Sequence, residues 1–187
     1  PLLAAQPVNA ESEPGSWPPG QNLLDALEEH RRLVVLGDPG GGKTTLANWL
    51  AWRLSAGLAT PLPAFLEGLV PLPCVLRELS GDVFAQETPL TGLVEPIVRR
   101  LLGDKASEEL KANLCARVEA GKYLLILDGV DEIPVSAREL VRNWVKAASI
   151  QEACVLVTSR IVGYDDMPVD RKDSLVGLWL NPLGTEE

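Results

Sequence analysis

A glycine-rich loop joins an apolar stretch to a helical stretch near the start of the chain, and this junction restricts the fold more than any other feature. The apolar run from Arg32 to Leu36 is predicted to be a buried strand, and Thr44 to Ser55 carries leucines at helical spacing. The loop between them reads GDPGGGKT and fits the pattern GxxxxGK[ST]. Strand, loop and helix in this order are the context in which that pattern binds nucleotide phosphates.

Each part of the loop has a role in binding phosphate. Glycines allow positive φ angles, so that backbone N–H groups can turn toward an anion, and the following helix presents its positive end to the same anion. Lys43 is expected to contact the β- and γ-phosphates, and the Thr44 hydroxyl to ligate Mg²⁺. The candidate nucleotide-binding residues are Gly37, Asp38, Pro39, Gly40, Gly41, Gly42, Lys43, Thr44 and Thr45.

A second motif follows another apolar strand, Tyr123 to Asp128, which is continued by an acidic pair, Asp131 and Glu132. An aspartate at the tip of a buried strand beside a phosphate loop can hold Mg²⁺, so Asp128 is the candidate metal ligand. Three carboxylates so close in sequence repel one another, which is tolerated best where a cation sits. Either member of the acidic pair could orient or deprotonate the attacking water. The alternative is an acidic turn that caps the helix beginning near Pro134.

A third apolar strand, Cys154 to Ser159, is followed by Arg160. In a parallel sheet the end of this strand lies near the other two motifs, where Arg160 could contact the γ-phosphate and respond to its hydrolysis. Alternatively, Arg160 is an ordinary surface residue.

The remaining elements predict an α/β fold. Short apolar strands that alternate with helices indicate a parallel sheet covered on both faces, with ligands bound beyond the carboxyl ends of the strands. Further strands are expected at 71–79 and 175–180, and further helices at 22–30, 88–102, 107–120 and 134–148.

Composition excludes several classes of protein. The 17 basic and 26 acidic side chains give a formal charge of −9, which argues against a general nucleic-acid-binding surface.

Residues 1–20 are rich in Pro, Gly, Ser and Glu and are predicted to form a flexible arm or linker. Neither a signal peptide nor a membrane span is recognisable, and the three cysteines are far apart and read as small buried residues. A cytoplasmic location is expected.

The sequence resembles the NACHT domain, a branch of the STAND class of P-loop ATPases, from about residue 33 to 183. The resemblance rests on LVVLGDPGGGKTTLANWLA, PLPCVLREL, YLLILDGVDEIP and CVLVTSRIVGY, which occur in the family's order. The small residue Gly129 after Asp128, followed by the acidic pair, is typical of the family. The Asn-Pro-Leu at 181–183 is similar to the segment that closes its last core strand.

The resemblance implies a three-layer P-loop NTPase fold over residues 21–187, with a five-stranded parallel sheet of order 2-3-4-1-5 and helices on both faces. It also implies binding of ATP or ADP with Mg²⁺. By position, Lys43 and Thr44 would bind phosphate and Mg²⁺, Asp128 would hold Mg²⁺, the acidic pair would be catalytic, and Arg160 would be the sensor. Because family members continue into a helical and a winged-helix domain, this chain is expected to be a truncated core with a pocket open on one side.

Two functions from different classes remain after this comparison. The first is an ATP-binding, slowly hydrolysing switch of a signalling or defence protein that controls oligomeric assembly. The second is a nucleotide-dependent scaffold without significant hydrolysis. A small-molecule kinase is disfavoured because no arginine-rich lid follows the third strand, and a GTPase because no NKxD-like sequence occurs. The expected partners are nucleotide and, in the full-length protein, further copies of itself; no membrane contact is expected.

Overall fold

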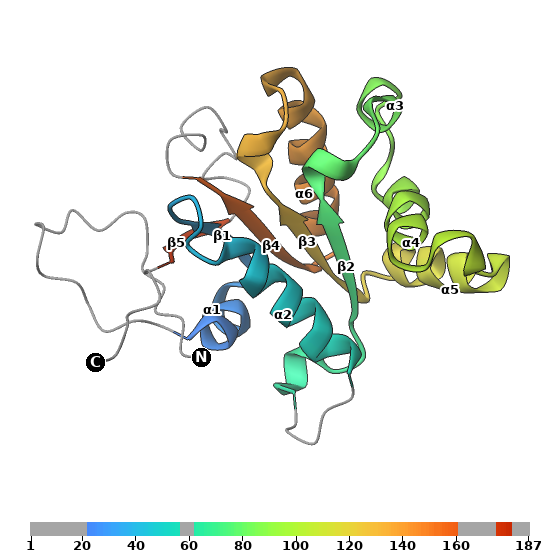
Figure 1. Cartoon of the computed structure of the whole chain (residues 1–187). Coiled ribbons are helices and arrows are strands. Elements are labelled where there is room, and N and C mark those ends of the chain that lie inside the picture. The colour runs from blue at the N-terminus through green and yellow to red at the C-terminus, as the bar shows by residue number, and fades with distance from the viewer. Residues whose placement is uncertain (1–21, 57–61, 161–174, 181–187) are drawn as a thin grey trace, which may run out of the picture.

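A single parallel sheet forms the centre of the protein. The computed structural model describes residues 22–56, 62–160 and 175–180. Its strands lie in the order β2-β3-β4-β1-β5, and each neighbouring pair is parallel, as expected for this fold class (Figure 1). The strands are β1 (Arg32–Leu36), β2 (Val70–Val75), β3 (Tyr123–Asp128), β4 (Cys154–Ser159) and β5 (Val176–Trp179). The expected arm at 1–20 and the Asn-Pro-Leu segment at 181–183 lie outside the described residues.

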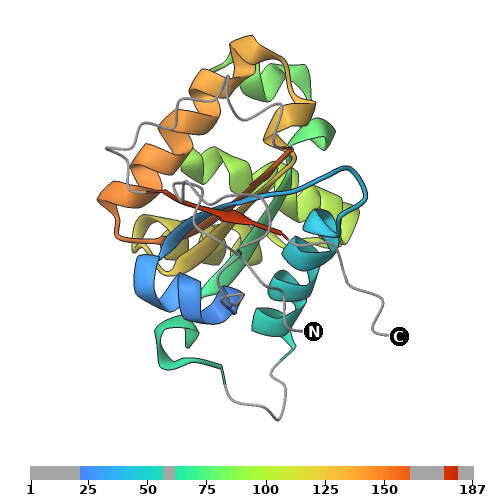
Figure 2. The same ribbon diagram turned by 90° about the vertical axis from the view of Figure 1, so that its left-hand side faces the viewer.

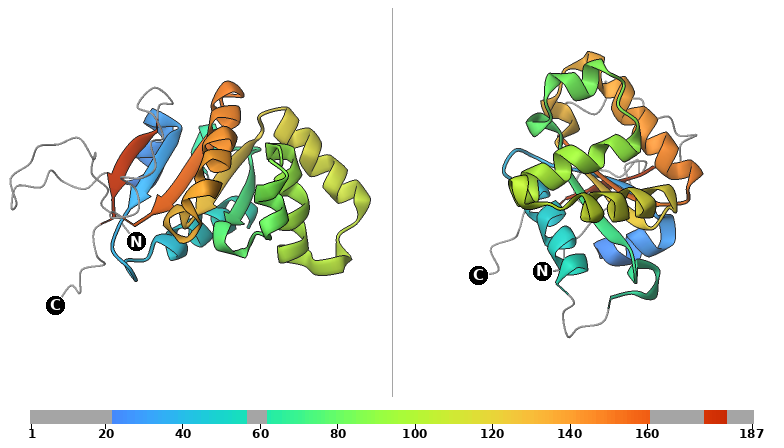
Figure 3. Two further views of the ribbon diagram at one scale, coloured as in Figure 1. Left: turned by 90° about the horizontal axis from the view of Figure 1, so that it is seen from above. Right: turned by 90° about the vertical axis from the view of Figure 1, so that its right-hand side faces the viewer.

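Helices cover both faces of this sheet, because its inner strands are apolar on both sides. Along β1, Leu33 and Val35 pack toward one face, and Val34 and Leu36 pack toward the other. The three layers can be followed in the view from above (Figure 3). The first face is covered by α1 (Leu23–His30) and α2 (Lys43–Ser55), and the second by α4 (Val94–Leu102), α5 (Glu108–Glu119) and α6 (Arg138–Ile150). None of the helices that the structure describes has the length and apolarity needed to cross a membrane.

The ends of α1 and α5 are fixed by side chains that the sequence places there. The Asn22 side chain accepts a hydrogen bond from the Leu24 N–H at 3.0 Å, and the Ser107 hydroxyl accepts one from the Leu110 N–H at 3.1 Å. Both bonds satisfy donors that the first turn of a helix leaves unpaired. The expected helices at 22–30 and 107–120 are therefore confirmed to within a residue at each end.

The second strand is shorter than predicted. It ends at Val75, and residues Leu76–Glu78 instead form η2, a single turn of 3-10 helix. Leu76 is fully buried, so the apolar pattern continues through the turn and gives no sign that the strand has ended. The helices expected at 88–102 and 134–148 also begin later, after the 3-10 turns η3 (Leu90–Leu93) and η6 (Val135–Ala137), and the short α3 (Gly81–Ala85) was not predicted.

Strand β2 lies at one edge of the sheet and carries two prolines on its outer side. The Val70 N–H donates to the Lys122 carbonyl at 3.2 Å. The backbone N–H and C=O groups of Val70, and of every second residue after it, therefore point toward β3. Pro71 and Pro73 therefore face away from the sheet, where the N–H that proline lacks is not needed for pairing. The opposite edge is formed by β5, which stands in the foreground of Figure 2 beside β1.

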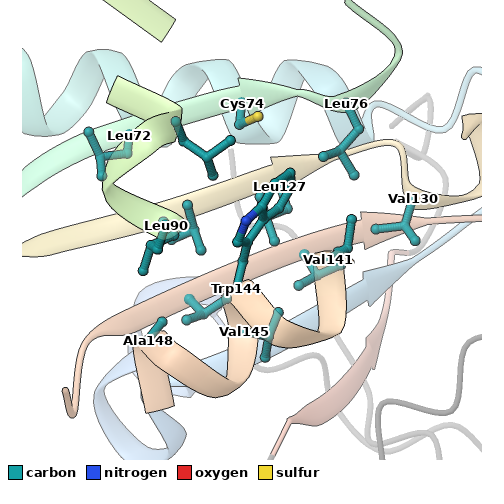
Figure 4. Close-up of a cluster of buried hydrophobic side chains, with 14 of the residues drawn as sticks. Leu72, Cys74, Leu76, Leu90, Leu127, Val130, Val141, Trp144, Val145 and Ala148 are labelled. Carbon is teal, nitrogen blue, oxygen red and sulfur yellow. The ribbon is translucent and has the colours of Figure 1, made fainter. Parts of the chain in front are cut away.

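The larger of the two cores lies between the sheet and α4 and α6 (Figure 4). Trp144 of α6 fills its middle and is only 2% exposed. Its indole N–H donates to the Thr88 carbonyl at 2.7 Å, and its ring lies 6.2 Å from the Phe84 ring, centroid to centroid. This core fixes α6 against β3 and β4, the two strands whose ends carry the acidic and Thr-Ser-Arg motifs.

The three cysteines are all unpaired. Cys74 and Cys154 are buried as expected, whereas Cys115 in α5 is only half-buried. Burial raises the pKa of the Cys74 thiol to about 12, so that this side chain is a neutral apolar group at physiological pH.

Candidate nucleotide-binding site

The glycine-rich loop leaves β1 at the carboxyl edge of the sheet and leads directly into α2. The Gly37 N–H donates to the Ser159 carbonyl at 3.3 Å, which ties the start of the loop to the end of β4. Gly40 and Gly42 have φ angles of 76° and 91°, in the left-handed region that favours glycine. Gly42 is also the N-cap of α2 and has no side chain to satisfy the unpaired N–H groups of the first turn. These donors, together with the positive end of the helix, form a site for an anion.

Lys43 folds back over this loop. Its ammonium group donates to the Gly37 carbonyl at 2.7 Å and to the Asp38 carbonyl at 2.8 Å. Both acceptors are neutral, and no carboxylate of the described residues forms an ion pair with Lys43. The positive charge of the lysine is therefore uncompensated and available to an anion at the loop.

Asp128 at the end of β3 is held by two hydroxyl groups. One carboxylate oxygen accepts from Thr44 at 2.9 Å and the other from Thr158 at 2.6 Å. The Thr158 hydroxyl in turn accepts from the Gly129 N–H at 3.0 Å, which fixes its orientation. Asp128 is 4% exposed and, among the described residues, has no basic partner. A buried carboxylate beside a threonine hydroxyl is the oxygen donor set that Mg²⁺ prefers.

Thr158 was not predicted as a site residue. The signal available was a polar residue near the end of the apolar run CVLVTS, at a position that turns out to be fully buried. A buried hydroxyl needs a partner, but the sequence does not say that the partner is Asp128, 30 residues away along the chain.

Asp131 uses both of its carboxylate oxygens to hold Arg160. One oxygen accepts from the Arg160 backbone N–H at 2.9 Å, and the other lies 3.0 Å from the Arg160 Nε. The Asp131 side chain is 8% exposed, whereas half of the Arg160 side chain is accessible. The arginine is thus anchored at its base while the rest of its guanidinium can contact another group.

Glu132, the other member of the acidic pair, has a different partner from Asp131. It pairs with Arg77 of η2, with 2.6 Å between the Arg77 Nη1 and the Glu132 Oε2. Arg77 was not predicted as a site residue, because it falls within the strand expected at 71–79 and that pattern gave no sign of a partner 55 residues further along the chain.

Each of the three acids has different partners among the described residues. Asp128 is held by hydroxyls, Asp131 by Arg160 and Glu132 by Arg77. Over the ranges that the structure describes, no three His, Cys, Asp or Glu side chains converge as a metal site. The acidic motif is tolerated because each carboxylate has its own partners: hydroxyl groups for Asp128, and an arginine for each of the other two.

Gly129 gives the acidic turn its shape. Its φ is 82°, and a Cβ added there would lie 2.9 Å from the Glu132 Oε2, closer than a real Cβ contact allows. A Gly129→Ala variant is expected to be about 1–3 kcal/mol less stable because of the strained backbone, and Glu132 must also move. Urea unfolding measures the loss. Gly81→Ala is the control, since a Cβ at Gly81 meets nothing within 4 Å; equal stability of both variants would contradict this account.

Residues of all three motifs surround one cavity of about 240 Å³ at the carboxyl edge of the sheet. This is below the roughly 300–1,000 Å³ of pockets that enclose a whole small molecule, so the cavity matches the phosphate end of a nucleotide rather than its base. Gly37 and Asp38, although predicted as site residues, do not line it. The lining residues are Pro39, Gly40, Gly41, Gly42, Lys43, Thr44, Thr45, Asp128, Gly129, Asp131, Glu132, Thr158 and Arg160.

Comparison with known proteins agrees with this architecture. The family model of the NACHT domain matches residues 31–178. The chain is also 24% identical, over 168 residues, to "Disease resistance protein Pik-1" of Oryza sativa subsp. japonica. That alignment covers 82% of this chain and 14% of the relative, so the chain spans only a small part of the protein that it matches.

Proposed function

Because this chain belongs to the NACHT family, we propose that it is the ATP-dependent switch of a signalling or defence protein. It binds ATP with Mg²⁺, hydrolyses it slowly, and couples the bound nucleotide to self-association. The observation that carries the proposal is the meeting of Lys43, Asp128 and Arg160 around one cavity. A defence role is supported by the name of the rice relative, a disease resistance protein.

Lys43 and the loop glycines are the proposed phosphate contacts. The lysine ammonium exchanges its two carbonyl partners for β- and γ-phosphate oxygens, a gain in electrostatic energy because charged acceptors replace neutral ones. The N–H groups at the start of α2 contact the same phosphates. The cavity is lined by the loop, the first turn of α2, and residues at or just after the ends of β3 and β4. These residues therefore recognise mainly the phosphates of the nucleotide.

Asp128 and the Thr44 hydroxyl are the proposed holders of Mg²⁺. They lie 2.9 Å apart, and Thr158 keeps the carboxylate in place from the other side. When bound, Mg²⁺ supplies positive charge that offsets the charge on the phosphate oxygens.

Glu132 is proposed to activate the attacking water. Asp131 is unsuited to this role because both of its oxygens hold Arg160, whereas Glu132 lines the cavity and is 28% exposed. The water oxygen forms a bond to the γ-phosphorus as the bond from that phosphorus to the ADP oxygen breaks, and Glu132 takes the proton of the water. Arg160, positioned by Asp131, contacts the γ-phosphate and loses that contact when phosphate leaves.

A titration with ATP and ADP, each with Mg²⁺, tests nucleotide binding. At a concentration a hundred times the Kd, ATP is expected to stabilise the protein by about 2.7 kcal/mol and raise its Tm by several degrees. An unchanged Tm at saturating ATP and ADP would contradict the proposed function. Light scattering with each nucleotide then tests whether self-association follows the bound state.

Exchanging the two acids separately tests their roles. Glu132→Gln is expected to lower the rate of phosphate release roughly a hundredfold without changing the Kd for ATP, because a general base contributes at least that factor. Asp131→Asn is expected to weaken the preference for ATP over ADP, because it loosens Arg160. If Asp131→Asn instead stopped hydrolysis and Glu132→Gln had no effect, the two roles would be reversed.

A nucleotide-dependent scaffold without hydrolysis is the second candidate. The observation in its favour is that both members of the acidic pair are already engaged by arginines. Under this alternative, the wild-type protein binds ATP and self-associates but releases no phosphate, and Glu132→Gln leaves self-association unchanged.

A further inference from the structure

Arg77 is the one basic side chain of the described residues that forms an ion pair with Glu132. The contact joins η2, which follows β2, to the acidic turn, which follows β3. Strand register explains the proximity: Val75 lies opposite Asp128, so the residues just beyond each strand end lie side by side. The Arg77 guanidinium is thus placed next to the turn by the pairing of two strands, and not by chance contact of two loops.

The backbone of η2 is held firmly on both sides of Arg77. Leu76 is fully buried in the core beneath α4 and α6, and the Leu79 N–H closes the turn by donating to the Leu76 carbonyl at 3.2 Å. Glu78, the next residue, forms an ion pair with Arg100 of α4. Arg77 therefore extends from a fixed point of the fold, which a positioning residue requires.

Glu132 has few other means of keeping its orientation. It lies on a short 3-10 turn (η5, Val130–Glu132) that follows a glycine, and its nearest charged neighbours along the chain, Asp128 and Asp131, are also acidic. The cations nearest to it in the site have other partners: Lys43 bonds the loop carbonyls, and Arg160 is held by Asp131. Without Arg77, repulsion from the other two acids favours rotamers that turn the Glu132 carboxylate away from the cavity.

Arg77 interacts electrostatically with the acidic turn. The hydrogen bond that Arg77 donates to Glu132 and the negative charge of Glu132 raise the pKa of the Arg77 guanidinium above its usual value, against a smaller opposing effect of desolvation. The arginine is thus charged at every accessible pH, and its influence on Glu132 is constant.

We propose that Arg77 is a positioning residue for hydrolysis: its ion pair holds the Glu132 carboxylate at the cavity, where one oxygen remains free to accept the proton of the attacking water. This inference rests on the proposed function, since it assigns a role within that reaction. Arg77 does not line the cavity that we assign to the phosphates. Its loss therefore affects the chemical step and not the binding of ATP.

Steady-state ATP hydrolysis by the purified protein tests the role of Arg77. R77Q is expected to lower kcat about tenfold, with KM and the Kd for ATP unchanged, because a misplaced reacting group slows only the chemical step. R77K, which keeps the charge but not the planar fork, is expected to fall between R77Q and wild type. R142Q is the matched control: it breaks an Arg–Glu ion pair of 2.9 Å on α6, outside the cavity, and is expected to hydrolyse ATP like the wild type.

A double substitution separates positioning from a general structural effect. If Arg77 acts through Glu132, R77Q is expected to cause no further loss of kcat in the E132Q background. An equal tenfold loss in that background, a raised KM at unchanged kcat, or a faster rate in R77Q would each overturn the inference. If R77Q does not fold, R77K carries the same comparison with a smaller expected loss.

The outcomes also separate this inference from the function on which it rests. A wild-type protein that binds ATP and releases no phosphate would overturn both hydrolysis and the role of Arg77. An active wild-type protein with an unimpaired R77Q and R77K would overturn the role of Arg77 alone.

Discussion

Replacing Lys43 with alanine is expected to weaken the binding of ATP roughly 100- to 10,000-fold. The ammonium makes two hydrogen bonds that can be exchanged for bonds to charged phosphate oxygens. Hydrogen bonds to charged groups contribute about 1.5–3 kcal/mol each, and about 1.4 kcal/mol corresponds to a factor of ten in affinity. Isothermal titration of wild type and Lys43→Ala with ATP and Mg²⁺ measures the difference.

Lys122→Ala is the control for this prediction. Lys122 is exposed and directly precedes β3, so it lies at the amino-terminal ends of the strands, whereas the cavity lies at their carboxyl ends. Its replacement removes the same charge at a place far from the cavity. We expect its affinity for ATP to equal that of the wild type. If both variants bound ATP equally well, the glycine-rich loop would not be the phosphate site. The free energy of unfolding of Lys43→Ala should change little, because the loop carbonyls that it releases are accessible to water.

Trp144→Ala is expected to have the largest effect on stability, a loss of about 3–5 kcal/mol in the free energy of unfolding. The side chain is 2% exposed and fills the space between α6, α3 and the sheet, so its removal leaves a cavity that rigid neighbours cannot close. It also leaves the Thr88 carbonyl without its donor. Since domains of this size are stable by about 5–15 kcal/mol, urea unfolding should show a partly unfolded population at low denaturant.

Two further substitutions interpret that result. Trp144→Phe keeps most of the apolar volume. Its free energy of unfolding should fall by only about 1–3 kcal/mol, because the variant loses the hydrogen bond to Thr88 and has a smaller ring. Trp52→Ala removes a tryptophan of α2 that is 55% exposed and is expected to change stability by about 0.5 kcal/mol or less. A Trp144→Ala protein as stable as Trp52→Ala would contradict the central place of Trp144 in the core.

The strands were predictable because each inner strand is apolar on both faces. Runs such as YLLILD and CVLVTS have no polar face, which only a sheet covered on both sides permits. The observed bounds of β3 and β4 are the same as the predicted ones. The end of β2 was not predictable for the same reason. Leu76 is as buried as the residues of the strand before it, so hydrophobicity carries no sign of the change from strand to 3-10 turn.

The site was predictable in its membership but not in its pairings. Parallel strands bring their carboxyl ends to one edge, which is why Lys43, Asp128 and Arg160 could be expected together. Which arginine faces which acid depends on the strand register and on where each turn closes. These are long-range properties: Arg77 meets Glu132 because Val75 lies opposite Asp128. For this reason the sequence did not show which member of the acidic pair has which role, whereas the structure gives Asp131 and Glu132 different partners.

The prolines on the outer side of β2 have a consequence for how copies of this protein can meet in solution. An incoming strand needs alternating donors and acceptors along an edge, and at Pro71 and Pro73 the donors are missing. Pairing of β2 with a strand of another copy, which would lead to irreversible aggregates, is therefore blocked at this edge of the sheet. The nucleotide-switched assembly that we propose would have to come apart again, and contacts between side chains on helices and loops meet that requirement better than a continuous sheet.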